Sequence, residues 1–189
     1  GWVMVAAARP GTHPMIRSRA LTCGLLLALT VAPSLAARPS ASELRMRDSI
    51  DADQAHAVAL LERLVNQNSG SLNLPGVAVV GELVRAELEP LGFDVQWIDM
   101  GATGRAGHLV ATHVGNGRGK RVLMIGHLDT VFEPDSPFQR FVRNGDSATG
   151  PGIADDKGGV VIIIAALRAM HAAGTLRDAD IKVVLTGDE

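Results

Sequence analysis

The 189-residue chain has few aromatic residues and only one cysteine. It contains no tyrosine, two tryptophans and four phenylalanines, and its single cysteine is Cys23. With so few aromatic side chains, the core of the folded part must be built from valine, isoleucine, leucine and alanine. A single cysteine also excludes a disulfide within the chain.

The sequence lacks the signatures of several functional classes. Its net charge is −2 and it has no lysine- and arginine-rich run, so nothing indicates a nucleic-acid partner. It has no Gly-x-Ser-x-Gly motif of a serine hydrolase. Residues 115–120 superficially resemble a phosphate-binding loop. They lack its spacing, and Arg121 stands where a serine or threonine should follow Lys120, so nucleotide binding is not expected.

The N-terminal region is expected to lie outside the fold. A basic start, twelve uncharged residues and a series of small residues follow Met15, which predicts a signal peptide over residues 15–36 and export to the periplasm. Residues 1–14 are interpreted as an upstream extension. The alternative is a membrane anchor, but Pro33 and the small residues favour cleavage, so no stable anchor is expected. Cys23 lies in this region, so histidine, aspartate and glutamate must hold any metal bound by the mature part.

Apolar spacing predicts alternating helices and strands after a polar, flexible lead-in. The lead-in covers residues 37–50, and the part after it, 51–189, is expected to be catalytic. Helices are predicted at 51–67, 75–91 and 157–173, and strands at 93–97, 108–114, 121–125 and 181–185. The apolar run at 121–125 is typical of a strand buried on both faces. The pattern indicates an α/β fold with a largely parallel or mixed sheet flanked by helices.

Three short motifs are expected to meet at one edge of this sheet. Ligands of such sheets bind beyond the C-terminal ends of the strands. His127 follows one apolar strand, Glu189 follows another, and Asp155 lies in a glycine-rich loop that leads into a helix. The motifs are Gly126–Thr130, Gly150–Gly159 and Thr186–Glu189.

Each motif could bind metal or take part in catalysis, and each also has an interpretation without such a role. In extended backbone His127 and Asp129 share a face, so Asp129 either orients a metal-ligating imidazole or takes part in catalysis; alone, the pair could be a polar turn. Asp155 and Asp156 concentrate carboxylate oxygens that can bridge two cations. The alternative, an anion-binding helix N-terminus, is disfavoured by their charge. Glu189 could be a metal ligand, a general base or a solvated terminus.

Together the motifs resemble those of the M20 family of zinc peptidases and deacylases, in particular its glutamate carboxypeptidase branch. The resemblance covers about residues 51–189. It implies that His127 ligates one zinc ion and that Asp155 bridges two. It also implies that Asp129 is the catalytic aspartate and that Glu189 is the general base.

The resemblance has further implications. The peptide bond between Asp155 and Asp156 should be cis. In the family a second glutamate, a zinc ligand, follows the position of Glu189, and further ligands and a lid or dimerisation domain lie downstream. We therefore expect an N-terminal fragment, inactive alone, of a protein that binds two zinc ions and could form a homodimer. The donor types would also admit cobalt or manganese.

The expected function is hydrolysis of a peptide or amide bond next to a free carboxylate, in a small peptide or an N-acyl amino acid. Because export is expected, a scavenging carboxypeptidase or aminoacylase fits better than cytosolic succinyl-diaminopimelate or acetylornithine deacylases. The competing hypothesis is a non-catalytic binding or structural protein on the same scaffold. The presence of His127, Asp129, Asp155 and Glu189 argues against it.

Overall fold

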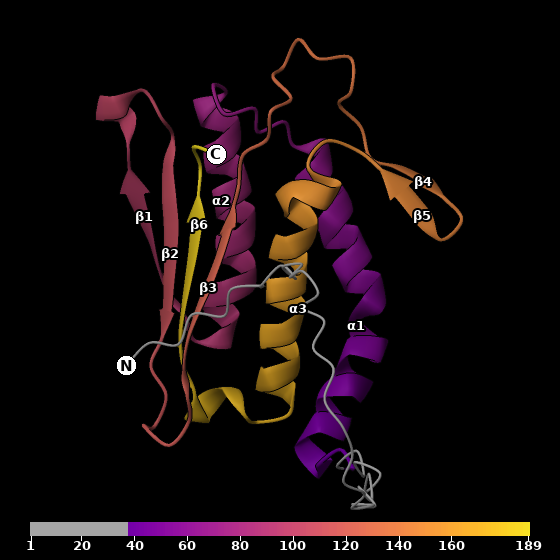
Figure 1. Ribbon diagram of the computed structural model, residues 1–189, viewed down its shortest axis with the longest axis vertical. Helices are drawn as coiled ribbons and strands as arrows, with labels where there is room; N and C mark the ends of the chain where they lie inside the picture. The colour runs from indigo at the N-terminus through magenta and orange to yellow at the C-terminus, as the bar shows by residue number, and fades with distance from the viewer. Residues whose placement is uncertain (1–37) are drawn as a thin grey trace, which may run out of the picture. The chain divides into compact units, whose positions relative to one another are not determined.

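The computed structural model describes residues 38–189 (Figure 1). The predicted upstream extension and signal peptide lie outside the described residues. The helices are α1 (Ala41–Asn66), α2 (Leu74–Leu88) and α3 (Gly158–Ala172), with short turns η1 (Glu89–Leu91), η2 (Gly101–Thr103), η3 (Ile153–Lys157) and η4 (Leu176–Asp178). The strands are β1 (Asp94–Asp99), β2 (Gly107–His113), β3 (Arg121–His127), β4 (Val142–Asn144), β5 (Ser147–Thr149) and β6 (Asp180–Thr186).

Helix α1 begins within the segment predicted to be a flexible lead-in. Ser40 caps the helix: its hydroxyl accepts a hydrogen bond from the Glu43 amide at 3.3 Å, and the Glu43 carboxylate accepts one from the Ser40 amide at 2.6 Å. This reciprocal capping box satisfies two amides at the helix start. The prediction for residues 37–50 is therefore wrong from Ala41 onward, because the polar composition of this stretch concealed a helix.

The main sheet has the strand order β1-β2-β6-β3, and it is mixed. The pairs β1–β2 and β2–β6 are antiparallel, and β3–β6 is parallel. The mixed sheet flanked by helices agrees with the predicted α/β class, but the sheet is not largely parallel. Only the connection from β3 to β6 contains a helix, α3; residues 100–106 between β1 and β2 are too few for a parallel crossover.

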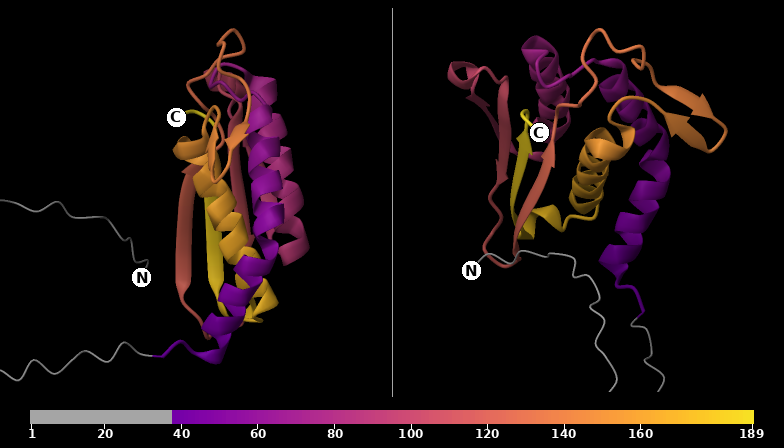
Figure 2. Two further views of the ribbon diagram at one scale, coloured as in Figure 1. Left: turned by 90° about the vertical axis from the view of Figure 1, so that its right-hand side faces the viewer. Right: turned by 45° about the horizontal axis from the view of Figure 1, so that its top comes forward.

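The helices gather on one side of this sheet (Figure 2). The aliphatic core lies between the two layers, as the scarcity of aromatics predicts. It contains Leu60 and Leu64 of α1, Val77, Val80 and Val84 of α2, Ile164 and Leu167 of α3, and Leu109, Ile181, Val183 and Leu185 of the sheet.

Strand β3 is not buried on both faces, contrary to the prediction from its apolar run. Its side chains alternate, and Leu123 and Ile125 are 44% and 65% exposed on the face away from the core. Val122 and Met124 pack against the core instead. No helix in the described part of the chain combines the length and the apolar character that a bilayer crossing requires.

Candidate active site

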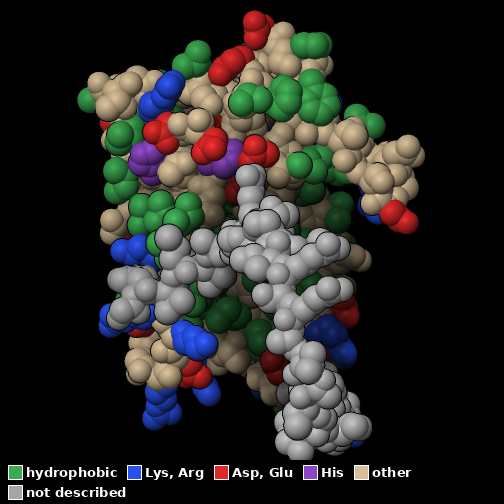
Figure 3. All heavy atoms as spheres, in the orientation of Figure 1, with side chains coloured by type: hydrophobic (Ala, Val, Ile, Leu, Met, Phe, Trp, Pro, Cys, Tyr) green, Lys and Arg blue, Asp and Glu red, His purple; other side chains and the backbone are tan. Residues whose placement is uncertain are grey.

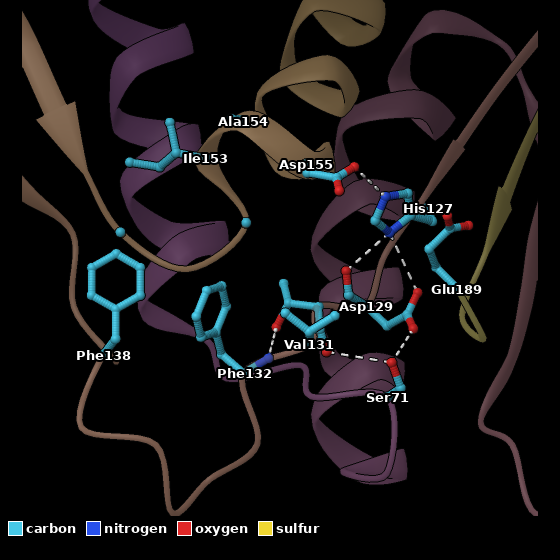
Figure 4. Close-up of a pocket in the computed structure, with 13 residues that line it drawn as sticks. Ser71, His127, Asp129, Val131, Phe132, Phe138, Ile153, Ala154, Asp155 and Glu189 are labelled. Atoms are coloured by element: carbon cyan, nitrogen blue, oxygen red, sulfur yellow. Dashed lines mark hydrogen bonds and ion pairs between the residues drawn. The ribbon is translucent and has the colours of Figure 1, made fainter.

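A cavity of about 360 Å³ opens where β3 and β6 end (Figure 4). The parallel register places His127 opposite Thr186, so the ends of both strands reach the same edge of the sheet. Acidic and histidine side chains gather over this edge in the space-filling view (Figure 3). The structure brings four of the predicted site residues together in the cavity wall: His127, Asp129, Asp155 and Glu189.

His127 is a buried residue whose two ring nitrogens face different partners. Its Nδ1 lies 3.0 Å from the main-chain oxygen of Asp129, and its Nε2 lies 3.0 Å from Oδ1 of Asp155. Burial disfavours the imidazolium, but these acceptors outweigh it, and the pKa of His127 is raised above its ordinary value. The Nδ1 proton is donated to the Asp129 carbonyl, which directs Nε2 at Asp155 and the cavity.

Asp129 is fully buried beside this imidazole. Its Oδ2 accepts a hydrogen bond from the Ser71 hydroxyl at 2.5 Å, and its Oδ1 lies 3.5 Å from Nδ1 of His127. Among the described residues, Oδ1 has no hydrogen-bond partner. Sequence reasoning expected the Asp129 carboxylate to fix the second ring nitrogen of His127. The main-chain oxygen of Asp129 lies closer to that nitrogen, at 3.0 Å, than the nearest carboxylate oxygen does, at 3.5 Å.

The adjacent aspartates point in different directions. The Asp155 side chain is 87% exposed and faces His127. The Asp156 carboxylate is packed between Gly126 and Gly159, where a Cβ atom on either glycine would overlap it. Burial raises the pKa of Asp156, and nearby Asp155 adds to the rise. The peptide bond between the two aspartates is cis, as the family resemblance implied.

The donors at this edge fit part of a metal site. Within residues 38–189, no three His, Cys, Asp or Glu side chains are grouped so as to hold a metal ion by themselves. His127 Nε2 and Asp155 Oδ1 are nonetheless a nitrogen and an oxygen donor 3.0 Å apart, and zinc accepts both types. The pair fits two positions of a zinc site, and further donors are needed to complete it.

The other wall of the cavity is apolar. Phe132 and Phe138 form an edge-to-face pair with ring centroids 5.1 Å apart, and Ile153 lies beside them in the cavity wall (Figure 4). The carboxylates and the imidazole face this wall across the opening. The arrangement can therefore hold a substrate with a polar, scissile group at one end and an apolar group at the other.

Two residues at the site were missed by sequence reasoning. Ser71 was assigned no role from the sequence, and it lines the cavity beside Asp129. Lys157 is 1% exposed and donates hydrogen bonds to the main-chain oxygens of Leu64 and Gln67. Burial lowers the pKa of Lys157 to about 8. No local pattern marks either residue, because their partners lie more than 50 residues away in the sequence.

Sequence comparisons identify relatives of the chain. Residues 123–189 match the model of peptidase family M20/M25/M40. The chain is 35% identical over 141 residues to carboxypeptidase G2 of Pseudomonas sp. strain RS-16, a match that covers 72% of this chain and 33% of that protein. It is 32% identical over 139 residues to succinyl-diaminopimelate desuccinylase of Novosphingobium aromaticivorans, covering 70% of this chain and 35% of that protein. The chain spans about a third of the length of these curated relatives.

Solved structures share the fold. Human carnosine dipeptidase 1 superimposes with a TM-score of 0.64 at 23% identity, over 79% of this chain and 35% of the dipeptidase chain. Aminopeptidase PepT of Bacillus cereus gives a TM-score of 0.57 at 21% identity, over 70% of this chain and 36% of that chain. The sequence matches confirm the resemblance drawn from the three motifs, and residues 123–189 of this chain belong to peptidase family M20/M25/M40.

Proposed function

We propose that the protein to which this chain belongs is a metal-dependent hydrolase. It cleaves a peptide or amide bond next to a free carboxylate, in a small peptide or an N-acyl amino acid. The observation that carries the proposal is the convergence of His127, Asp129, Asp155 and Glu189 on one cavity. Similarity to a carboxypeptidase and to a desuccinylase supports the same class of bond, since both names describe removal of a group from an amide.

The proposed roles follow from the contacts of each side chain. His127, held through its Nδ1, offers Nε2 as a ligand, and Asp155 offers an exposed carboxylate that can bridge two ions. Two zinc ions would be bound by the natural protein at full length, and cobalt or manganese also suits these donors. When bound, such ions act as Lewis acids and lower the pKa of a water molecule. Glu189 accepts the proton of the attacking water, and Asp129 keeps the His127 ring in place.

The proposed location is outside the cytoplasm. The basic start, apolar run and small residues between positions 15 and 36 support export through a signal peptide. An exported enzyme of this class would scavenge amino acids from peptides or N-acyl compounds outside the cell. Its substrates would carry a free carboxylate because they derive from amino acids.

The test uses the natural protein at full length, purified with and without metal. Hydrolysis of an N-acyl amino acid is expected to need zinc, to stop on chelation and to weaken when the substrate carboxylate is amidated. Glu189→Gln should lower kcat by about 10²–10⁴-fold with zinc content unchanged, as loss of a general base predicts. Glu62→Gln, on the exposed surface of α1, is the matched control. A full-length protein that binds no metal and cleaves no amide would instead be a non-catalytic binding protein.

A further inference from the structure

We infer that Ser71 is a positioning residue of this site, whose hydroxyl fixes the Asp129 carboxylate so that its second oxygen faces His127. The inference rests on the proposed function. Ser71 Oγ lies 2.5 Å from Asp129 Oδ2, and Asp129 Oδ1 lies 3.5 Å from His127 Nδ1. Figure 4 shows the three side chains in this order, from the loop after α1 to the end of β3.

Asp129 depends on this hydroxyl because it is fully buried. A buried carboxylate is costly unless its oxygens accept hydrogen bonds. Among the described residues, Ser71 is the one side chain that donates a hydrogen bond to the Asp129 carboxylate, and Oδ1 accepts none. A short hydroxyl-to-carboxylate bond belongs to the charge-assisted class, which is roughly twice as strong as a neutral bond. Removing the hydroxyl would leave both carboxylate oxygens without a donor from the described side chains.

The position of Ser71 is itself set by the backbone. Its amide donates to the Thr130 carbonyl at 3.0 Å, and the Thr130 amide donates to the Ser69 carbonyl at 2.8 Å. The Ser69 hydroxyl donates to the Leu128 carbonyl at 2.9 Å. These three bonds tie the segment after α1 to the segment after β3, and Gly70 pairs with Thr130 as an isolated parallel bridge. The Ser71 hydroxyl is therefore in place before any ligand arrives.

The hydroxyl has one proton and two acceptors within reach. The Thr130 carbonyl lies 3.3 Å from Ser71 Oγ, whereas Asp129 Oδ2 lies at 2.5 Å and carries charge. The Ser71 hydroxyl therefore donates its proton to Asp129 Oδ2, which forms the shorter, charge-assisted bond. The effect reaches the His127 ring through the charge on Asp129 Oδ1, which lies 3.5 Å from Nδ1, while the main-chain oxygen of Asp129 accepts the Nδ1 proton. Groups that orient a metal-binding histidine in this way typically change metal affinity or activity by about 10–100-fold when they are removed.

A purely structural role for Ser71 can be separated from the positioning role. Ser69→Ala is the matched control, because Ser69 belongs to the same pair of segments and its hydroxyl bonds to the Leu128 carbonyl instead of the Asp129 carboxylate. If Ser71 acts through Asp129, its replacement changes the metal site more than it changes stability. If Ser71 only joins the two segments, both alanine variants behave alike. Ser71→Thr keeps the hydroxyl and should restore the wild-type properties.

The experiment measures zinc affinity by competition with a chromophoric chelator, using the natural protein at full length. Ser71→Ala is expected to weaken zinc binding by about 10–100-fold and to lower kcat with little change in KM. The visible absorption of the cobalt-substituted protein should change as well. Ser69→Ala should lower the unfolding temperature and leave zinc affinity close to wild type.

Two outcomes would overturn the inference while leaving the proposed function intact. In one, an active, zinc-binding wild type is matched by Ser71→Ala in affinity and in the cobalt spectrum. In the other, Ser69→Ala loses as much zinc affinity as Ser71→Ala. A wild-type protein that neither binds zinc nor hydrolyses amides would refute the proposed function, and the positioning role would fall with it.

Discussion

The ammonium group of Lys157 lies 2.8 Å from the main-chain oxygen of Leu64, inside the protein. It lies 2.9 Å from the main-chain oxygen of Gln67, so a single buried side chain satisfies two carbonyls at the C-terminal end of α1. The positive charge also suits the negative end of the helix dipole. Because Lys157 closes the loop that carries Asp155, it couples the end of α1 to the candidate site.

Replacing Lys157 with methionine is expected to destabilise the protein by about 2 kcal/mol. The variant keeps the apolar stem but leaves one buried and one part-buried carbonyl without this donor, and each unsatisfied buried group costs about 1–3 kcal/mol. Relief from burying a charge offsets part of this cost. The free energy of unfolding, from urea titration, checks the value. Lys120→Met, in an exposed turn, should be nearly neutral, and equal effects of the two variants would contradict the structural role of Lys157.

The stability of the protein should depend on pH as the lowered pKa of Lys157 predicts. Its pKa is lowered from 10.5 to about 8 in the folded protein, so between these values the unfolded chain binds more protons. Stability therefore rises with pH across this window. The difference in unfolding free energy between wild type and Lys157→Met should grow from pH 8 to pH 10. A difference that stays flat or shrinks would show that the amine is not held in this environment.

Gly159→Ala should disturb the candidate site through Asp156. A Cβ atom at position 159 would overlap the Asp156 carboxylate, and backbone on the far side limits its movement. Overpacking of this kind costs about 1–3 kcal/mol, more than the gain of up to about 1 kcal/mol from replacing a helical glycine. Unfolding free energy and zinc affinity should both fall. Gly101→Ala, on an exposed turn, is the control; an unaffected Gly159→Ala variant would mean that Asp156 can move freely.

Asp155→Asn tests the proposed bridging role in the full-length protein. An amide offers one oxygen and no charge, so it cannot bridge two cations as a carboxylate does. The variant is expected to retain fewer than two zinc ions per chain after dialysis, measured by elemental analysis. Asp135→Asn, an exposed carboxylate on a nearby loop, should retain the wild-type content. Two tightly bound ions in the Asp155→Asn variant would rule out the bridge.

The parts of the fold that local patterns describe were predictable. The apolar runs at 121–125 and 181–185 mark strands within two residues of their observed ends, because branched aliphatic side chains favour strands locally. The same runs placed His127 and Glu189 at one edge, since a helix between two strands makes them parallel. The start of α1 was hidden by polar residues, although Ser40 and Glu43 form a capping box that could have revealed it.

Other features depend on contacts between distant segments and have no local signal. The apolar run of β3 does not tell which of its faces is covered, and Ile125 is exposed. The Ser71–Asp129 bond joins residues 58 positions apart, and the Lys157–Leu64 bond joins residues 93 positions apart. Such partners are chosen by the packing of whole helices against the sheet. They appear only once the fold is known.

The cavity takes its observed form only when β3 and β6 pair in the correct parallel register. His127 stands opposite Thr186, and side chains on a strand alternate between faces. A slip of one residue would exchange the two faces of β6 and shift the Glu189 turn relative to the imidazole. Loops around the cavity can change in length at a small cost in free energy. One residue inserted inside β6 would instead move the site residues away from one another. A copy with the wrong register would therefore lack the arrangement of His127, Asp129, Asp155 and Glu189 around the cavity.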